Sequence, residues 1–120
     1  MLTHKKYDLE ERTARFGESV IVFAKQLPRN DITKRIIPQL VAAATSVGAN
    51  YCEADCSESN KDFIHKMSIA NKEAKESKHF LRMVSKACEE YIKEGRILWK
   101  EANELNLIFT TIIKKSKEKL

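Results

Sequence analysis

Apolar residues recur along the chain at alternating steps of three and four, which is the spacing of one face of an α-helix. Four such stripes follow one another, from Leu9 to Leu27, Ile36 to Ala54, Phe63 to Cys88 and Leu98 to Ser116. A helix with one apolar stripe must cover it against another element. Four stripes joined by short connections predict an all-α fold, an antiparallel up-down four-helix bundle.

Breaker and capping residues place the helix ends. Pro28 ends the first helix, because it cannot donate a backbone hydrogen bond and disfavours helical geometry at the residue before it. Asp8 with Glu11 is typical of a capping box at the first helix, and Asn30 or Asp31 can cap the second. Ser57, Ser59 and Asn60 are candidate caps for the third. We expect one domain over residues 1–120, with helices at about 9–27, 32–55, 60–89 and 94–117.

Three features of this plan stay open. Pro38 inside the second helix predicts either a kink or a fresh helical start, because it clashes with the carbonyl of Lys34. A turn over residues 91–93 is expected between the third and fourth helices, with a continuous helix through Gly95 as the alternative. The second helix also carries a small-residue face, which permits close packing within the bundle or between subunits: Ala42, Ala43, Ala44, Ser46, Gly48 and Ala49.

Composition narrows the functional classes. The 120 residues include 3 Gly and 2 Pro, too few turn residues for a sandwich, a barrel or a Gly-rich nucleotide-binding fold. The cysteines Cys52, Cys56 and Cys88 are an odd and sparse set, which favours reduced thiols and a cytoplasmic protein over a disulfide framework. The longest nearly apolar stretch, 105–113, is far shorter than the ~20 residues of a membrane-spanning helix.

The sequence contains no recognised catalytic constellation. Cys52 and Cys56 supply only half a zinc site, and no histidine is spaced to complete it. His65 and His79 lie about 21 Å apart along one helix at 1.5 Å per residue, too far to act on one substrate. Glu73 and Glu76 alternate with Lys72, Lys75 and Lys78, which predicts an ion-paired, solvated face. We therefore expect no metal, no cofactor and no enzymatic activity.

The charge is concentrated near the C-terminus. The formal net charge is +5, and three of those charges arise from the last seven residues. Lysines at this density can contact phosphates, or they can form a solubilising tail. The candidate nucleic-acid-binding residues are Lys114, Lys115, Lys117 and Lys119. Tyr91 and Trp99 are isolated aromatics, without the interleaved platform on which single strands stack.

The middle of the chain resembles a known bacterial family. The similarity is carried by Ala44-Thr45-Ser46-Val47-Gly48-Ala49-Asn50-Tyr51-Cys52-Glu53-Ala54, by Ser59-Asn60-Lys61-Asp62-Phe63-Ile64-His65-Lys66-Met67 and by residues 70–77, and it extends over about 8–117. These segments resemble the four helix bundle proteins known as 23S ribosomal-RNA intervening-sequence proteins. The matching positions with an expected structural role are Ser46, Asn50, Tyr51, Glu53 and Phe63; we expect Asn50 and Glu53 to satisfy polar groups between the second and third helices.

The resemblance implies a ring-like homopentamer without agreed catalytic residues. A related branch, the accessory proteins of diversity-generating retroelements, binds nucleic acid and a reverse transcriptase. We therefore expect a non-enzymatic oligomer that binds RNA or DNA through clustered basic residues. The alternative is a protein-interaction scaffold with no nucleic-acid role.

Overall fold

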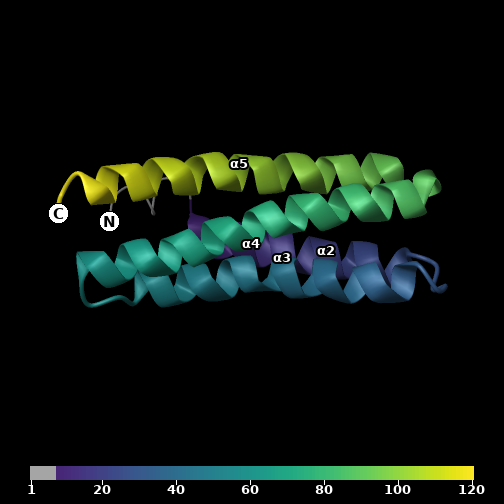
Figure 1. Ribbon diagram of the computed structural model, residues 1–120, viewed down its shortest axis with the longest axis horizontal. Helices are drawn as coiled ribbons and strands as arrows, with labels where there is room; N and C mark the ends of the chain where they lie inside the picture. Colours follow the sequence, from purple (N-terminus) through teal and green to yellow (C-terminus); the bar gives the residue numbers. More distant parts are fainter. Residues whose placement is uncertain (1–7) are drawn as a thin grey trace.

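The computed structural model describes residues 8–120 and shows long helices packed side by side in an up-down-up-down arrangement (Figure 1). The long helices are α2 (Leu9–Gln26), α3 (Thr33–Asp55), α4 (Asn60–Ala87) and α5 (Ile92–Lys117), and a short 3-10 helix, η1 (Glu89–Tyr91), joins the last two. The expected helix ranges differ from these by two residues at most. The described residues contain no strand, so the predicted all-α four-helix bundle is confirmed.

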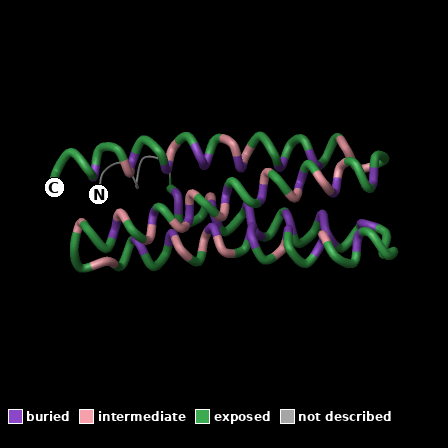
Figure 2. Tube along the Cα trace, in the orientation of Figure 1, coloured by how far each residue is buried: buried purple, intermediate pink, exposed green. Residues whose placement is uncertain are grey.

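The predicted apolar stripes form the core. Figure 2 shows the buried positions as a repeating inward-facing row on each helix. Every residue of three stripes is buried: Leu9, Thr13, Phe16, Val20, Phe23 and Leu27; Phe63, Met67, Ala70, Ala74, Ser77, Leu81, Val84 and Cys88; Leu98, Ala102, Leu105, Phe109, Ile112 and Ser116. None of the helices within residues 8–120 is long and apolar enough to cross a bilayer.

Helix α3 buries a wider face than its stripe predicts. Ile36 and Asn50 are only half-buried, whereas their neighbours Ile37 and Tyr51 are buried. The reason is that α3 packs against both α2 and α4, so two adjacent faces are covered and a single stripe is too narrow a description. The Tyr51 ring stacks on Phe109 of α5, with ring centroids 6.4 Å apart.

The start of α2 differs from its prediction. Asp8 has a left-handed backbone (φ 47°, ψ 56°), and its side chain makes no capping hydrogen bond. A capping side chain reaches the free N–H groups of a helix from β-region backbone angles, which Asp8 does not have. Only its backbone carbonyl takes part, accepting a hydrogen bond from the Arg12 N–H at 2.9 Å. The predicted capping box is therefore wrong.

The next two helices begin as the sequence predicts. The Asn30 side-chain oxygen accepts hydrogen bonds from the backbone N–H groups of Ile32 and Thr33, at 2.9 and 3.0 Å. Thr33 closes this connection by donating from its hydroxyl to the Pro28 carbonyl at 2.7 Å. At α4, the Ser59 hydroxyl accepts from the Asp62 N–H at 3.1 Å. Capping by Asn30 and by Ser59 is thus confirmed.

Two of the open alternatives are now decided. Helix α3 continues through Pro38, so the predicted fresh start is wrong; the proline lies in the second turn, at an exposed position where water can reach the Lys34 carbonyl that it leaves without a helical partner. A continuous third and fourth helix is also wrong, because α4 ends at Ala87. The break lies earlier than residues 91–93, and Gly95 falls in the first turn of α5.

Helix α2 is the peripheral member of the bundle. It packs mainly on α3 and approaches α5 at few positions. The polar link to α5 is a two-pronged ion pair, in which the Arg12 guanidinium donates to both carboxylate oxygens of Glu101, at 2.7 and 2.8 Å. Glu104 lies 3.4 Å from the same guanidinium. The hydrogen bond to Glu101 is the main reason why the pKa of Arg12 lies above its usual range.

The contact between α2 and α3 is tight at Gly48 but leaves room for a methyl group at Gly17. A Cβ added at Gly17 would have ordinary contacts, with the Ala44 carbonyl oxygen 3.6 Å away. A Cβ added at Gly48 would lie 3.2 Å from the Thr13 hydroxyl oxygen. That hydroxyl is buried and donates to the Leu9 carbonyl at 2.7 Å, so it is not free to move away.

The two environments predict different effects on stability when each glycine is replaced by alanine. Gly17→Ala should raise the free energy of unfolding by about 0.5–1 kcal/mol, because alanine loses less backbone entropy in a helix. Gly48→Ala should lose that gain, because the new methyl group presses on the held Thr13 hydroxyl. Urea denaturation followed by circular dichroism measures both. Equal stabilisation of the two variants would contradict the close contact at Gly48.

Candidate nucleic-acid interface

The lysines predicted to bind nucleic acid lie together at the end of α5. Lys114, Lys115 and Lys117 are in its last turn, and Lys119 follows two residues later; all four are exposed. Positive charges at this position also complement the negative end of the helix dipole. The end of α5 is tied to the start of α4 by a hydrogen bond from the Asn60 amide to the Ser116 carbonyl, at 2.8 Å.

The elements near this end of the bundle also carry acidic side chains. The end of α3 and the start of α4 lie at the same end of the bundle as the C-terminus, and the first turn of α2 is set back from it (Figure 1). Over residues 8–12, 52–69 and 109–120, seven basic residues face eight acidic ones: Asp8, Glu10, Glu11, Glu53, Asp55, Glu58, Asp62 and Glu118. This end is therefore close to neutral, and the lysines do not produce a strongly positive surface there.

The positive excess lies at the opposite end, which carries the α2–α3 and α4–α5 connections. Residues 22–36 and 78–100 contain four acidic residues, Asp31, Glu89, Glu90 and Glu94, and ten basic ones: Lys25, Arg29, Lys34, Arg35, Lys78, Arg82, Lys86, Lys93, Arg96 and Lys100. We call this the basic end. Sequence reasoning missed it, because the two segments are far apart along the chain and only the up-down topology brings them together.

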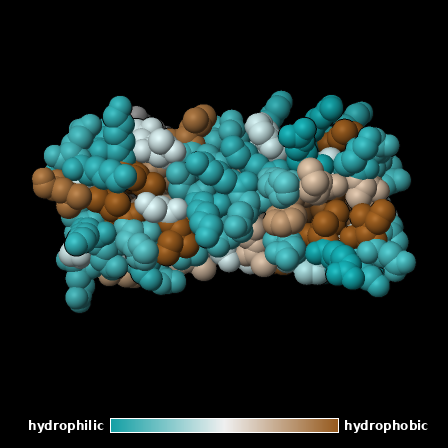
Figure 3. Space-filling model, in the orientation of Figure 1, coloured by the Kyte–Doolittle hydropathy of each residue, from teal (hydrophilic) through white to brown (hydrophobic). Residues whose placement is uncertain are grey.

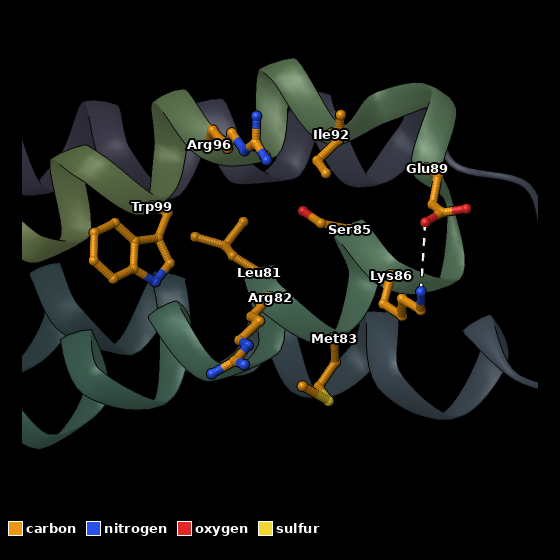
Figure 4. A pocket seen from close by; sticks show the side chains of 10 residues that line it. Leu81, Arg82, Met83, Ser85, Lys86, Glu89, Ile92, Arg96 and Trp99 are labelled. Carbon is orange, nitrogen blue, oxygen red and sulfur yellow. Dashed lines mark ion pairs between the residues drawn. The ribbon is translucent and has the colours of Figure 1, made fainter.

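A groove between α4 and α5 opens within the basic end. It has a volume of about 590 Å³, and Leu81, Arg82, Ser85, Ile92, Arg96 and Trp99 are among the residues that line it. We call it the Trp99 groove. In Figure 4 the indole lies at one end of the groove beside Leu81, and Arg96 from α5 and Arg82 from α4 lie on opposite sides. The face seen in Figure 3 is mostly hydrophilic, and its hydrophobic side chains gather in separate patches, one of them at this end.

The lack of a side chain at Gly95 allows α4 and α5 to approach each other closely beside the groove. A Cβ at this position would lie too close to the Ser85 hydroxyl oxygen for any ordinary contact, and near the ring of Phe23 from α2. The absence of a side chain therefore allows α5 to lie directly against Ser85 of α4. This contact closes one side of the groove.

Only some of the charged side chains that line the Trp99 groove form ion pairs. Lys86 forms an ion pair with Glu89, with 3.6 Å between the ammonium nitrogen and the carboxylate oxygen. Within residues 8–120, neither Arg82 nor Arg96 forms an ion pair, and both are exposed. The groove therefore presents two guanidinium groups whose charge is not neutralised by an ion pair.

Trp99 is held from outside the groove. The Lys78 ammonium lies 5.3 Å from the centre of the indole ring, a cation–π distance. The same ammonium donates to the Asn103 side-chain oxygen at 3.1 Å. Lys78 is not among the residues that line the groove. Trp99 as a whole residue is 38% exposed.

The predicted ion-paired face around Glu73 and Glu76 is wrong. Neither glutamate has an ion pair with a described residue, and Lys78 contacts Trp99 instead. Partial burial raises the pKa of Glu73, and the charge of Glu76 and a hydrogen bond between the two carboxyl groups raise it further. Lys72 opposes this shift without cancelling it. The pair is thus a local repulsion on α4.

The residues expected to be structural have mixed roles. Tyr51 and Phe63 are buried, and Glu53 accepts from the Lys66 ammonium of α4 at 2.8 Å, which confirms the expected link between the second and third helices. The Asn50 amide instead donates to the Ser46 carbonyl of its own helix at 2.9 Å. The interhelical role expected of Asn50 is wrong, because its amide hydrogen bond is made within α3.

Two of the three thiols, those of Cys52 and Cys88, are less acidic than a free cysteine. Burial raises the pKa of the Cys52 thiol, and nearby Glu10 raises it further; burial also raises the pKa of Cys88. A raised pKa leaves less of the nucleophilic thiolate at neutral pH. His65 and His79 are exposed. Within residues 8–120, no group of three or more potential metal ligands comes together.

Comparison with known proteins decides the family. Residues 5–111 match the family described as "23S rRNA-intervening sequence protein". The chain belongs to the 23S rRNA-intervening sequence protein family. The resemblance seen in the sequence is thereby confirmed.

A solved structure shows the same architecture. It is a Bacteroides thetaiotaomicron protein described as having unknown function and as coming from the S23 ribosomal protein family. The two chains are 27% identical and superpose with a TM-score of 0.74, over 88% of this chain and 97% of the other. No curated protein matches the chain. The function of this 23S rRNA-intervening sequence protein must therefore be argued from its own surfaces.

The repulsion at Glu73 predicts a pH-dependent effect. Because folding raises the pKa of Glu73, this group makes stability fall as the pH rises from the unfolded pKa, about 4.3, through the folded value. Glu73→Gln should therefore stabilise the protein at pH 7, and the gain should vanish near pH 3. Thermal melting at both pH values tests this, with Glu18→Gln, an exposed site on α2, as control. A gain that is equal at both pH values would contradict the raised pKa of Glu73, which burial and the neighbouring Glu76 cause.

Proposed function

We propose that this protein is a non-enzymatic, oligomeric module that binds RNA or DNA through its clustered basic side chains. The observation that carries the proposal is the basic end, where ten basic residues meet four acidic ones. Each phosphate that a lysine or arginine neutralises releases condensed counterions, so such a surface binds nucleic acids with little sequence preference. The C-terminal lysines 114, 115, 117 and 119 supply further contacts, weakened by the acids around them.

The same proposal includes assembly, because one copy offers few contacts. Two apolar surfaces support it. A shallow groove between α2 and α3 is lined largely by small or apolar groups, with Ala14, Gly17, Ile21 and Ala49 among them, and Glu10 and Glu18 also line it. Ile21 is 41% exposed. On α5, Ile97 and Leu107 are more than half exposed. Different surfaces that bind each other in a head-to-tail manner generate rings when the rotation between copies closes, and open filaments when it does not.

A ring of five copies, as the family resemblance implies, would combine the positive charges of five chains in one assembly. The net charge of +5 becomes about +25, and weak phosphate contacts gain from being linked. The related retroelement branch adds a reverse transcriptase as a further proposed partner. The second candidate function is a protein-interaction scaffold, favoured by the exposed Ile97 and Leu107 if nucleic-acid binding is absent.

Matched charge variants test the basic end. The triple variant Arg35→Gln, Lys93→Gln, Lys100→Gln removes three exposed charges outside the Trp99 groove. It should weaken binding of a labelled RNA or DNA about tenfold or more and reduce the salt slope by about two to three, at ~0.7–0.9 per contact. The control Lys114→Gln, Lys115→Gln, Lys117→Gln removes the same charge at the neutral end and should have a smaller effect.

Gel-shift and anisotropy titrations measure these affinities. A larger effect of the control triple would place the interface at the C-terminal lysines, as the sequence alone predicted. Absence of any shift at ~50 mM salt, with structured RNA and with duplex DNA, would overturn nucleic-acid binding and favour the scaffold.

Light scattering after size exclusion tests assembly. The mass should exceed the 13.8 kDa of one chain and reach about 69 kDa for five copies. Ile21→Glu places a charge in the α2–α3 groove and should release monomers, whereas Ile32→Glu, at an exposed isoleucine in the α2–α3 connection, should not. A wild-type monomer at micromolar concentration would overturn the oligomer.

A further inference from the structure

Resting on the proposed nucleic-acid-binding function, we propose that the Trp99 groove binds an unpaired base of a single-stranded nucleic acid. The base stacks on the indole of Trp99, and the flanking phosphates are held by Arg82 and Arg96. The groove thus adds a preference for single strands to a surface that otherwise attracts any polyanion.

The proposed base stacking depends on how the Trp99 side chain is held in position. The indole lines the groove and is 38% exposed, so part of its surface is open to a ligand. Lys78 contacts the ring from outside the groove, at 5.3 Å, and Asn103 holds that ammonium in turn. Trp99 is therefore supported in one orientation. A flat ring held this way can stack on a base of any sequence.

The proposed phosphate contacts depend on Arg82 and Arg96. They lie on opposite sides of the groove (Figure 4), and within residues 8–120 neither is engaged in an ion pair. The one acidic residue that lines the groove, Glu89, is paired with Lys86 at 3.6 Å. Guanidinium groups bind phosphate oxygens in a bidentate manner. The charges thus match a ligand with an anionic group on either side of a flat apolar centre.

The size and lining of the groove favour a base that is unpaired. Its volume of about 590 Å³ lies within the ~300–1,000 Å³ of small-molecule sites, and Leu81 and Ile92 make part of the lining apolar. A base in a duplex has both faces stacked on its neighbours, so it cannot present a face to Trp99. An unpaired base can leave its stack at little free-energy cost.

The chain provides its own reporter for this contact, because Trp99 is the single tryptophan. The experiment titrates the full-length protein with a ten-nucleotide oligo(dT), with the same strand in a duplex, and with a ten-nucleotide abasic strand of equal charge. Indole fluorescence should be quenched by oligo(dT) only. Anisotropy of labelled strands gives the affinities, and oligo(dT) should bind more tightly than the abasic strand.

Two substitutions separate stacking from charge. Trp99→Leu should weaken oligo(dT) binding about 5- to 150-fold, from the ~1–3 kcal/mol of one stacked base, and leave abasic-strand binding unchanged. Trp99→Phe should restore most of the loss, because the aromatic face is retained. Thr111→Ala, at an exposed site on α5 that lines neither groove, is the control and should change neither affinity. If the Leu variant loses its helical circular dichroism, Arg82→Gln with Arg96→Gln repeats the test on the phosphate contacts.

The outcomes distinguish this inference from the proposed function. Binding of nucleic acid with equal affinity for oligo(dT) and abasic strands, or an unaffected Trp99→Leu variant, would overturn the groove and leave the basic end intact. No binding of any strand at ~50 mM salt would overturn both. Quenching by poly-glutamate as strong as that by oligo(dT) would assign the groove to acidic polypeptides and overturn the base site.

Discussion

The arrangement of the whole bundle depends on the buried stripe of α4, which runs from Phe63 to Cys88. Helix α4 makes the most extensive contacts in the structure, with α3 on one side and α5 on the other, and its residues Met67, Leu81 and Val84 are fully buried between them. Helix α2 joins this core from the edge, through the glycine-mediated contact with α3 and the Arg12–Glu101 ion pair. Since the apolar stripe of each helix is used in this core, the charged and aromatic groups that remain are on outer faces. The candidate interface is therefore a consequence of how the stripes are paired.

The sequence predicted this core well because burial depends on a local and repeated property. In a helix, residues three and four positions apart share a face, so the positions of Leu81 or Phe109 follow from spacing alone. The predictions were wrong where more than one backbone conformation or hydrogen-bond partner was available to a residue. Asp8 could have capped α2 from an extended backbone but adopts a left-handed one, and Asn50 could have reached α4 but bonds to the preceding turn. Both choices depend on the neighbouring helices, which the spacing does not contain.

The candidate site could not be predicted in the same way, because its parts belong to different segments. The lysines after residue 113 form a dense run in the sequence, yet they lie at an end of the bundle that also carries Glu53, Asp55 and other acids. The basic end has no comparable run, since its charges are spread over residues 22–36 and 78–100. Likewise, Trp99 is an isolated aromatic along the chain, and it becomes part of a groove only because Gly95 lets α5 lie against Ser85. Net charge and motif density describe a chain, whereas phosphate binding depends on charge density over a surface.

The surfaces proposed for assembly and for nucleic acid do not compete for the same residues. The apolar groove with Gly17 and Ile21 lies between α2 and α3, whereas Arg82, Arg96 and Trp99 line a groove between α4 and α5. A ring whose axis runs along the helices would keep both in use: neighbouring copies would meet along their sides, and every copy would present its basic end on the same face of the ring. The linked copies would then increase affinity through many phosphate contacts, while each Trp99 groove would bind one base. Under this geometry the modest charge of a single copy is sufficient, because affinity comes from the number of linked copies and selectivity from the groove that each one carries.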